Sequence, residues 1–493
     1  MSLKQKAVSG FTWTFAQLFS VQVINFIVQI VLARILLPSE FGLIAMLSIF
    51  ISIGLTLMDG GFTSSLIRTT NADQSDYSTV FFINLINSIV IYLLLFFAAP
   101  YIASFYNEPI LSGIIRVYTL SFIIRAFVAV QTTKLIKEMR FKLQLMMQIP
   151  SVAIGAITGI ILAYSGYGVW SLVWMNLLQS FLYSAQHWIR SGWYPSLQLN
   201  WEKVKYHFGF GYKLTLSSLL DTVFNNIYNL VIGKYFSATQ LGFYNRADTI
   251  QKFPTLLIFN ALDRVTYPML SSIQNDDVKL KSAYQKVMQQ VIFLIAPLMI
   301  FLGVMAKPLF SFVLTDKWLP AVPFFQLLCI TGILLPLQTS NLQILKVKGR
   351  SDLYLRLEVI KKSIIAVSIL CFLPLGIFGL LYSQVILSLL MFYISAHFSG
   401  RMIGYSALQQ TIDVLPIILL SLIVGFFIWL SKTFVIPFTN LNDFGGIVLC
   451  AGIYAGLYIY LGHLFRLKPL KEISGILLKK RNLTTKDVAA LKK

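Results

Sequence analysis

Long apolar runs dominate the chain and predict membrane-spanning helices. A helix needs about 20 residues to cross a hydrocarbon core roughly 30 Å thick, and about fourteen runs reach or approach that length. They cover residues 11–36, 41–66, 79–105, 110–132, 144–164, 168–188, 212–236, 242–267, 284–306, 320–344, 357–375, 377–399, 412–432 and 444–465. The pattern predicts an all-α polytopic membrane protein whose short loops leave no room for a separate soluble domain.

The chain contains an internal duplication. Residues 32–42 and 232–242 align without a gap, glycine on glycine, and the same offset pairs Asn25 with Asn225 and Gln29 with Asn229. Each copy would hold six helices, so both copies enter the membrane in the same direction. We therefore predict two parallel six-helix repeats: a lobe at 1–200, a second lobe at 201–405, and a region at 406–493 with two more helices and a basic cytoplasmic tail. Many membrane carriers are two similar bundles, so the duplication indicates a transporter.

The charge distribution fits a membrane protein and not a nucleic-acid binder. The net charge is +21, yet only 12% of the residues are charged, 57% are hydrophobic and the mean hydropathy is +0.75. Basic residues gather in alternate loops, at 134–142, 190–205, 279–281 and 346–350. Because cytoplasmic loops carry the excess of Lys and Arg, both termini are expected in the cytoplasm. The remaining attraction is for anionic lipid headgroups, so membrane lipids are expected partners and nucleic acid is not.

No pattern of residues indicates catalysis. The three cysteines lie far apart inside apolar runs, and a phosphate-binding glycine-rich loop is absent. The histidines have no acidic or cysteine neighbour at metal-ligand spacing: His187, His207, His397 and His463. We expect no enzyme activity, no metal and no cofactor.

Polar stripes in two corresponding helices are candidate substrate contacts. In the first predicted helix Gln22, Asn25 and Gln29 share one face, and in the seventh Asn225 and Asn229 lie in the same register. Polar side chains inside a membrane usually face protein or a watery cavity. Hydrogen bonding between neighbouring helices is the alternative. Because the stripe occurs in both halves, we expect it to line a cavity.

The helix expected at 242–267 carries the most charge. Arg246 and Arg264 are five turns apart on one face, separated by about 27 Å at 1.5 Å per residue. They place a cation near each mouth of a path along this helix. Lys252 is a further candidate, although Asp248 lies one turn away and could neutralise it.

Two further arginines and three acids complete the candidates. Arg116 and Arg125 lie on opposite faces of the helix expected at 110–132, so only one would face a central cavity. Asp59 and Asp263 each precede a leucine by seven positions, and Asp221 lies beside the second polar stripe. Proton or cation coupling is one role for these acids, and helix capping or a salt bridge is the other.

The chain resembles the bacterial polysaccharide flippases of the Wzx type, in particular the colanic-acid and teichuronic-acid export branch of the multidrug/oligosaccharidyl-lipid/polysaccharide superfamily. The resemblance covers most of the chain and is most specific at 32–38, 41–43, 59–62, 66–67 and 241–247. It implies two six-helix lobes around a central cavity, followed by two C-terminal helices. It also implies a cargo, an undecaprenyl-pyrophosphate-linked oligosaccharide, turned from the inner to the outer leaflet of a bacterial inner membrane.

The residues suit that cargo. Arginine offers a planar fork for a pyrophosphate, and amide and aromatic side chains suit sugars. The expected partners are the lipid-linked oligosaccharide and, as candidates, a polysaccharide polymerase and glycosyltransferases. A multidrug or cation antiporter of the same superfamily is the alternative, but the helix at 242–267 is net basic and favours anionic cargo. A non-transporting scaffold of a synthesis complex would not need paired polar stripes.

Overall fold

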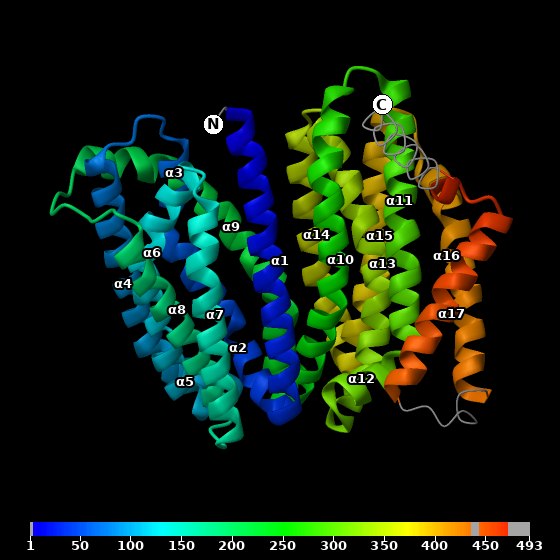
Figure 1. Cartoon of the computed structure of the whole chain (residues 1–493), viewed down its shortest axis with the longest axis horizontal. Helices are drawn as coiled ribbons and strands as arrows, with labels where there is room; N and C mark the ends of the chain where they lie inside the picture. Colours follow the sequence, from blue (N-terminus) through cyan, green and yellow to red (C-terminus); the bar gives the residue numbers. More distant parts are fainter. Residues whose placement is uncertain (1–2, 435–442, 472–493) are drawn as a thin grey trace, which may run out of the picture. The chain divides into compact units, whose positions relative to one another are not determined.

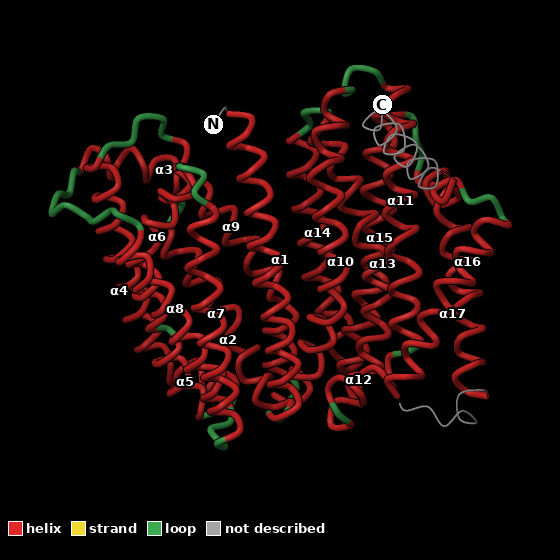
Figure 2. The backbone as a smooth tube through the Cα atoms, viewed as in Figure 1, coloured by secondary structure: helices red, strands yellow, loops and turns green. Residues whose placement is uncertain are grey.

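The computed structural model describes residues 3–434 and 443–471, and all regular structure in these ranges is helical (Figure 2). Each apolar run predicted to cross the membrane is helical, although the runs at 41–66 and 110–132 are each divided between two helices. Within the described residues, nine stretches are both long enough and apolar enough to span a bilayer, and three of them hold two or more successive helices. The prediction of an all-α polytopic membrane protein is confirmed.

The chain divides into two compact units, Met1–Asn245 and Arg246–Lys493. The helices of the first unit are α1 (Leu3–Ile35), α2 (Pro38–Asp59), α3 (Phe62–Arg68), α4 (Gln74–Tyr106), α5 (Ile110–Tyr118), α6 (Leu120–Lys137), α7 (Phe141–Tyr164), α8 (Val169–Arg190), α9 (Trp201–Tyr235) and the first residues of α10 (Ala238–Ser272). Helix α9 packs against α2, α3 and α4, whereas α1 packs against α7. In this unit, α3 and the loop that leads into α9 lie at the opposite end from α5 (Figure 1). The predicted boundary between the two lobes, at residue 200, was drawn from the duplication and stays a prediction.

The second unit continues α10 and adds seven α-helices and two short 3-10 helices within the described residues. They are α11 (Asp277–Val304), α12 (Ala306–Leu314), η1 (Asp316–Ala321), α13 (Val322–Val347), α14 (Ser351–Phe372), η2 (Leu373–Leu375), α15 (Gly376–Ile403), α16 (Ala407–Phe434) and α17 (Asp443–Leu464). The last two are the additional C-terminal helices that the sequence predicts. Helix α16 packs on α11, and the Tyr458 hydroxyl of α17 donates to the Phe293 carbonyl at 3.1 Å. The basic stretch at 479–481 lies outside the described residues.

The duplication is visible in the order and ends of the helices. Helix α1 ends at Ile35 and α2 begins at Pro38, and α9 and α10 repeat this junction 200 residues later. A long, a short and a long helix follow in each half, α4 to α6 and α11 to α13. Aspartate side chains cap the first long helix of each set, Asp73 on α4 and Asp276 on α11. An aspartate at this position satisfies backbone N–H groups that the helix itself leaves unpaired.

Helices α2 and α10 cross at two glycines that the duplication relates. A methyl group on Gly42 would lie 1.7 Å from the Ala238 carbonyl oxygen, and one on Gly242 would lie 1.9 Å from the Pro38 carbonyl oxygen. Pro38 and Ala238 are themselves equivalent positions of the repeat, so the contact is reciprocal. Small residues let helix backbones approach closely in a membrane. The sequence pattern around Gly42 and Gly242 is therefore explained by backbone contact.

We predict that Gly42→Ala destabilises the protein, because the added methyl group has no space beside the Ala238 carbonyl. Overpacking costs about 1–3 kcal/mol. Thermal unfolding of the purified protein in detergent measures the effect. Gly209→Ala is the matched control: it is also helical, it meets nothing within 4 Å, and it should be neutral or stabilising. Equal unfolding temperatures for the two variants would contradict the assigned contact.

Candidate functional site

The polar residues of the α9 stripe have different surroundings: two bond to a neighbouring helix and one is exposed. The Asn229 side-chain amide donates to the Ser48 hydroxyl of α2 at 3.2 Å, and Thr222 bonds Thr56 of α2 at 3.3 Å. Asn225, between them along α9, is exposed. Asn229 therefore forms a hydrogen bond between neighbouring helices, which was the alternative to lining a cavity. Asn225 lies outside these two bonds between α2 and α9.

The corresponding residues of α1 are exposed to a similar extent. Gln22 is exposed, and Asn25 and Gln29 are half-buried. Helix α1 packs mainly on α7. A cavity-lining role for Gln22, Asn25 and Gln29 stays a prediction.

The charged residues of α10 have distinct surroundings. Arg246 is buried, with 4% of its surface exposed, and its guanidinium lies 5.5 Å from the centre of the Trp318 ring. A cation over an aromatic face is attracted by the ring quadrupole. Lys252 is exposed and forms an ion pair with Asp248 at 2.7 Å, one turn away. The side chains of Asp263 and Arg264 lie outside the described residues.

The two other arginines belong to separate helices, because the expected helix at 110–132 breaks between α5 and α6. Arg116 of α5 stacks on Phe96, 4.6 Å from the ring centre, and donates to the Phe96 carbonyl at 3.3 Å. Arg125 of α6 donates to the Ser180 hydroxyl of α8 at 3.4 Å. Each arginine therefore contacts a neighbouring helix of the first unit.

The described acids of the candidate list show no common arrangement. The Asp59 carboxylate accepts from the Thr63 backbone N–H at 3.4 Å, across the turn between α2 and α3, which is the capping role weighed above. Asp221 is exposed on α9. The assignment of these acids to ion coupling stays a prediction.

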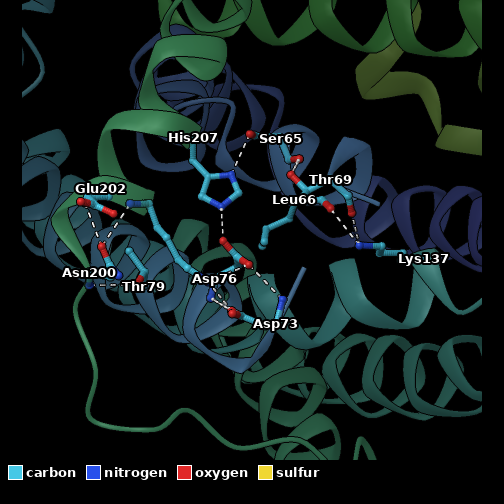
Figure 3. A network of polar contacts seen from close by, with 11 residues as sticks. Ser65, Leu66, Thr69, Asp73, Asp76, Thr79, Lys137, Asn200, Glu202 and His207 are labelled. Carbon is cyan, nitrogen blue, oxygen red and sulfur yellow. Dashed lines mark hydrogen bonds and ion pairs between the residues drawn. The ribbon is translucent and has the colours of Figure 1, made fainter. Parts of the chain in front are cut away.

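Sequence reasoning missed one polar network, which lies where α3, α4 and α9 meet (Figure 3). His207 is fully buried between the Ser65 hydroxyl, at 2.8 Å from Nδ1, and the Asp76 carboxylate, at 3.3 Å from Nε2. Because a carboxylate only accepts, neutral His207 carries its proton on Nε2 and accepts from Ser65. Lys203 adds a cation 3.0 Å from Asp76. The partners are more than 120 residues apart, so no local spacing could reveal them.

The elements around the network hold it in place. Asn200 caps the start of α9 by accepting from Glu202 N–H at 2.9 Å, and Gly61 touches the backbone of Gly211 one turn beyond His207. Lys203 also pairs with Asp73, and this hydrogen bond holds the pKa of the Asp73 carboxyl at about 2. The network therefore fastens the first turns of α9 to α4.

The order Ser65, His207, Asp76 has the chemistry of a hydrolytic triad, but not its access. A nucleophilic serine must reach a substrate carbonyl beside oxyanion donors. Ser65 is only 2% exposed, and its hydroxyl points to the ring inside the helix bundle (Figure 3). The network is suited to joining helices.

We predict that acidification weakens this junction. Burial lowers the pKa of His207, which precedes the expected span at 212–236 and faces Asp76 of α4, Ser65 of α3 and Lys203 of its own helix. The neutral form thus contributes stability above the unfolded pKa of about 6.5. That contribution is lost as the pH falls toward the lower folded value, because the unfolded chain binds more protons.

The unfolding temperature of the wild-type protein should therefore drop between pH 7.5 and pH 5.5, and His207→Asn should reduce that drop. His397→Asn, on an exposed histidine of α15, is the control and should leave the drop unchanged. A drop of the same size in the His207 variant would rule out this role.

Together these features define a class: a membrane transporter built from two repeats of helices, with polar and cationic residues in its helices. The chain belongs to the polysaccharide biosynthesis protein family, whose pattern it matches over residues 31–323. This confirms the resemblance drawn from the sequence.

Two curated relatives show the breadth of the match. The chain is 25% identical to the lipopolysaccharide biosynthesis protein WzxC of Escherichia coli (strain K12), over 73% of this chain and 74% of the relative. It is 26% identical to the teichuronic acid biosynthesis protein TuaB of Bacillus subtilis (strain 168), over 71% and 73%.

Solved structures share the fold. The lipid II flippase MurJ in an inward closed conformation superimposes with a TM-score of 0.70 at 16% identity, covering 92% of this chain and 98% of that one. An inward-facing multidrug transporter of the MATE family gives a TM-score of 0.57 at 16% identity, covering 78% and 95%. At this identity the likeness shows the fold alone.

Proposed function

We propose that this protein flips an undecaprenyl-pyrophosphate-linked oligosaccharide from the cytoplasmic to the outer leaflet of a bacterial inner membrane, for polysaccharide biosynthesis and export. The observation that carries the proposal is membership of the polysaccharide biosynthesis protein family over residues 31–323. The relatives named for lipopolysaccharide and teichuronic acid biosynthesis support the same class of cargo. The protein is a transporter and not an enzyme.

The charge of Arg246 and the amides of Asn225 and Gln22 support a cargo with an anionic head group and sugars. Arg246 lies buried beside Trp318, where the local dielectric is low and a cation attracts an anion strongly, so the proposal requires that alternating access uncovers its guanidinium. A guanidinium also binds the oxygens of a phosphate through two parallel hydrogen bonds. Asn225 and Gln22 offer exposed amides for sugar hydroxyls. Arg264, Lys252, Arg116, Arg125, Asn25, Gln29 and Asn229 remain secondary candidates.

Alternating access supplies the mechanism. Helices α2 and α10 touch through the reciprocal glycine contact, which offers a pivot of small area between repeat-related helices. The Asn229–Ser48 and Thr222–Thr56 bonds between α2 and α9 lie within the first unit and would keep these two helices together during such a motion. Asp59, Asp221 and Asp263 are candidate sites for a coupling ion.

A multidrug or cation antiporter is the second candidate, and the fold shared with a MATE transporter supports it. A cationic cargo requires acids in the cavity, whereas the described helix α10 buries an arginine and pairs its acid Asp248 with Lys252. Family membership and this balance of charge favour the flippase.

Orientation and partners are part of the proposal. The basic loops support cytoplasmic termini, and a polymerase and glycosyltransferases of the same pathway are candidate partners. After replacement of the native cysteines, a membrane-impermeant maleimide should label a cysteine at exposed Asn107 in intact cells, but not one at exposed Arg350. Labelling at position 350 instead would reverse the orientation.

Arg246 provides the sharpest test of the cargo. Arg246→Met should reduce transport about 10- to 100-fold, because hydrogen bonds to charged groups contribute about 1.5–3 kcal/mol. Arg246→Lys should retain part of the activity, since lysine keeps the charge but loses the fork. The readout is leaflet-resolved accumulation of the lipid-linked glycan on the cytoplasmic side, at equal abundance of membrane-inserted protein.

Lys279→Met is the control, because Lys279 is exposed and pairs with Asp276 in the turn before α11. It should leave transport unchanged. Normal glycan distribution in the Arg246→Met cells would remove Arg246 from the substrate path. Equal loss in Arg246→Lys and Arg246→Met would indicate a packing role against Trp318.

A further inference from the structure

A cavity of about 510 Å³ lies within the first unit, between α9 and the ends of α2, α3 and α4. Its lining is almost entirely apolar. On α9 it follows a single stripe: Trp201, Val204, Phe208, Tyr212, Thr215, Leu216 and Leu219. The opposite wall includes Phe62 of α3 and Ile83, Ile86 and Asn87 of α4. We call this cavity the α4–α9 groove.

The groove is long and aromatic. From Trp201 to Leu219 it runs about 27 Å along α9, at 1.5 Å per residue. Phe208 stacks on Tyr212 at 5.7 Å and lies 6.5 Å from Phe62, so these three rings cover part of the wall. Such a shape suits a flexible chain laid along the helix, whereas a compact ligand would fill only part of it.

The groove lies at the edge of the expected membrane span. Its deep end, at Leu219, lies within the span expected at 212–236, whereas Trp201 lies before that span. From the start of the span to Leu219 the groove follows about 10 Å of α9, at 1.5 Å per residue. A lipid chain in this part of the groove would lie within one leaflet, whose hydrocarbon is about 15 Å thick.

The residues around the groove complement an anionic head group. The Arg68 guanidinium lies 4.6 Å from the ring centre of Phe210, and the Lys213 ammonium lies 5.8 Å from that of Tyr212, a wall residue. Lys205 is exposed on the same helix. Among the described residues, none of these three cations forms an ion pair with an acid. Phe210 and Tyr212 lie about midway between Trp201 and Leu219, close to the start of the span expected at 212–236, so a diphosphate at this level would meet unneutralised cations.

We propose that the α4–α9 groove binds the polyprenyl chain of the lipid-linked substrate before its head group is moved, with Arg68, Lys205 and Lys213 attracting the diphosphate. The proposal rests on the proposed function for the identity of the lipid. It assigns to the tail a site inside the first unit whose lining does not include the residues assigned to the sugar. Holding the tail there would keep the head group close to the cytoplasmic surface.

Photocrosslinking of the full-length protein in lipid nanodiscs tests the site. A benzophenone amino acid is placed at Ile86, which lines the groove, or at Leu94, which is exposed on the same helix but not in the lining. The probe is undecaprenyl diphosphate without sugar, and phosphatidylglycerol is the second arm. The probe should label position 86 several-fold more than position 94, and excess phosphatidylglycerol should not displace it.

A filling variant makes the test independent of the crosslinker. Leu216→Trp places a large ring in the groove and should reduce labelling at position 86 several-fold. Leu214→Trp, on an exposed residue of α9 outside the lining, should leave it unchanged. Both proteins should be monodisperse before the comparison.

Equal labelling at positions 86 and 94 would overturn the proposal, because it would indicate ordinary surrounding lipid. Labelling of position 86 by phosphatidylglycerol to the same extent would also overturn it, in favour of a resident phospholipid. These readouts require binding but no flipping. A protein that binds the probe in the groove yet fails to flip a lipid-linked glycan would refute the proposed function and leave the groove assignment in place.

Discussion

The close approach of α2 and α10 at Gly42 and Gly242 joins two repeat-related helix junctions within the first unit. Two backbone surfaces touch there without side chains, and each glycine faces the residue that opens the other helix, Ala238 or Pro38. In a membrane, helices gain little from the hydrophobic effect on pairing with each other, so tight packing of small residues is what holds them. The duplicated sequence at 32–42 and 232–242 therefore meets itself in a backbone contact that leaves no room for a larger residue at either glycine.

Helix α9 is held in the first unit at successive levels, and Asn225 lies between two of the residues that hold it. At its start, His207 and Lys203 fasten it to Asp76 of α4. Farther along, Gly211 meets the turn at Gly61, and then Thr222 and Asn229 bond α2. In hydrocarbon each polar group must find a partner inside the protein, so these bonds are costly to break without replacement. The groove uses the apolar face of the same helix, which these bonds leave uncovered.

Much of the fold could be predicted from the sequence, because its main determinant is local. Apolar runs long enough to cross a bilayer are visible directly, and all of them are helical, two of them as a pair of successive helices. The duplication also predicted the matching junctions at Pro38 and Ala238. One predicted span is in fact two helices, and the cause is backbone geometry. Gly60 and Gly61 both adopt positive φ angles and break the expected span at 41–66 into α2 and α3.

The sites were harder to predict, because side-chain partners are set by packing between distant segments. A polar stripe identified Asn225 and Asn229 equally, yet Asn229 bonds Ser48 while Asn225 is exposed, and periodicity alone does not separate these outcomes. His207 looked isolated because Asp76 is 131 residues away in sequence. Arg246 was a candidate for its charge, but only the structure shows Trp318 beside it. The groove is lined almost entirely by apolar residues, which are typical of ordinary membrane-helix surface in the sequence.

The central claim is that this chain moves a lipid-linked glycan between leaflets. Its most direct test is reconstitution of the purified full-length protein into liposomes with a labelled undecaprenyl-pyrophosphate oligosaccharide in one leaflet. A glycan-cleaving enzyme outside the vesicles then reports the arrival of the head group in the outer leaflet. We expect the head group to arrive in the outer leaflet far faster in vesicles with the protein than in protein-free vesicles. Arrival at the protein-free rate, together with transport of an organic cation by the same vesicles, would contradict the flippase and favour the antiporter.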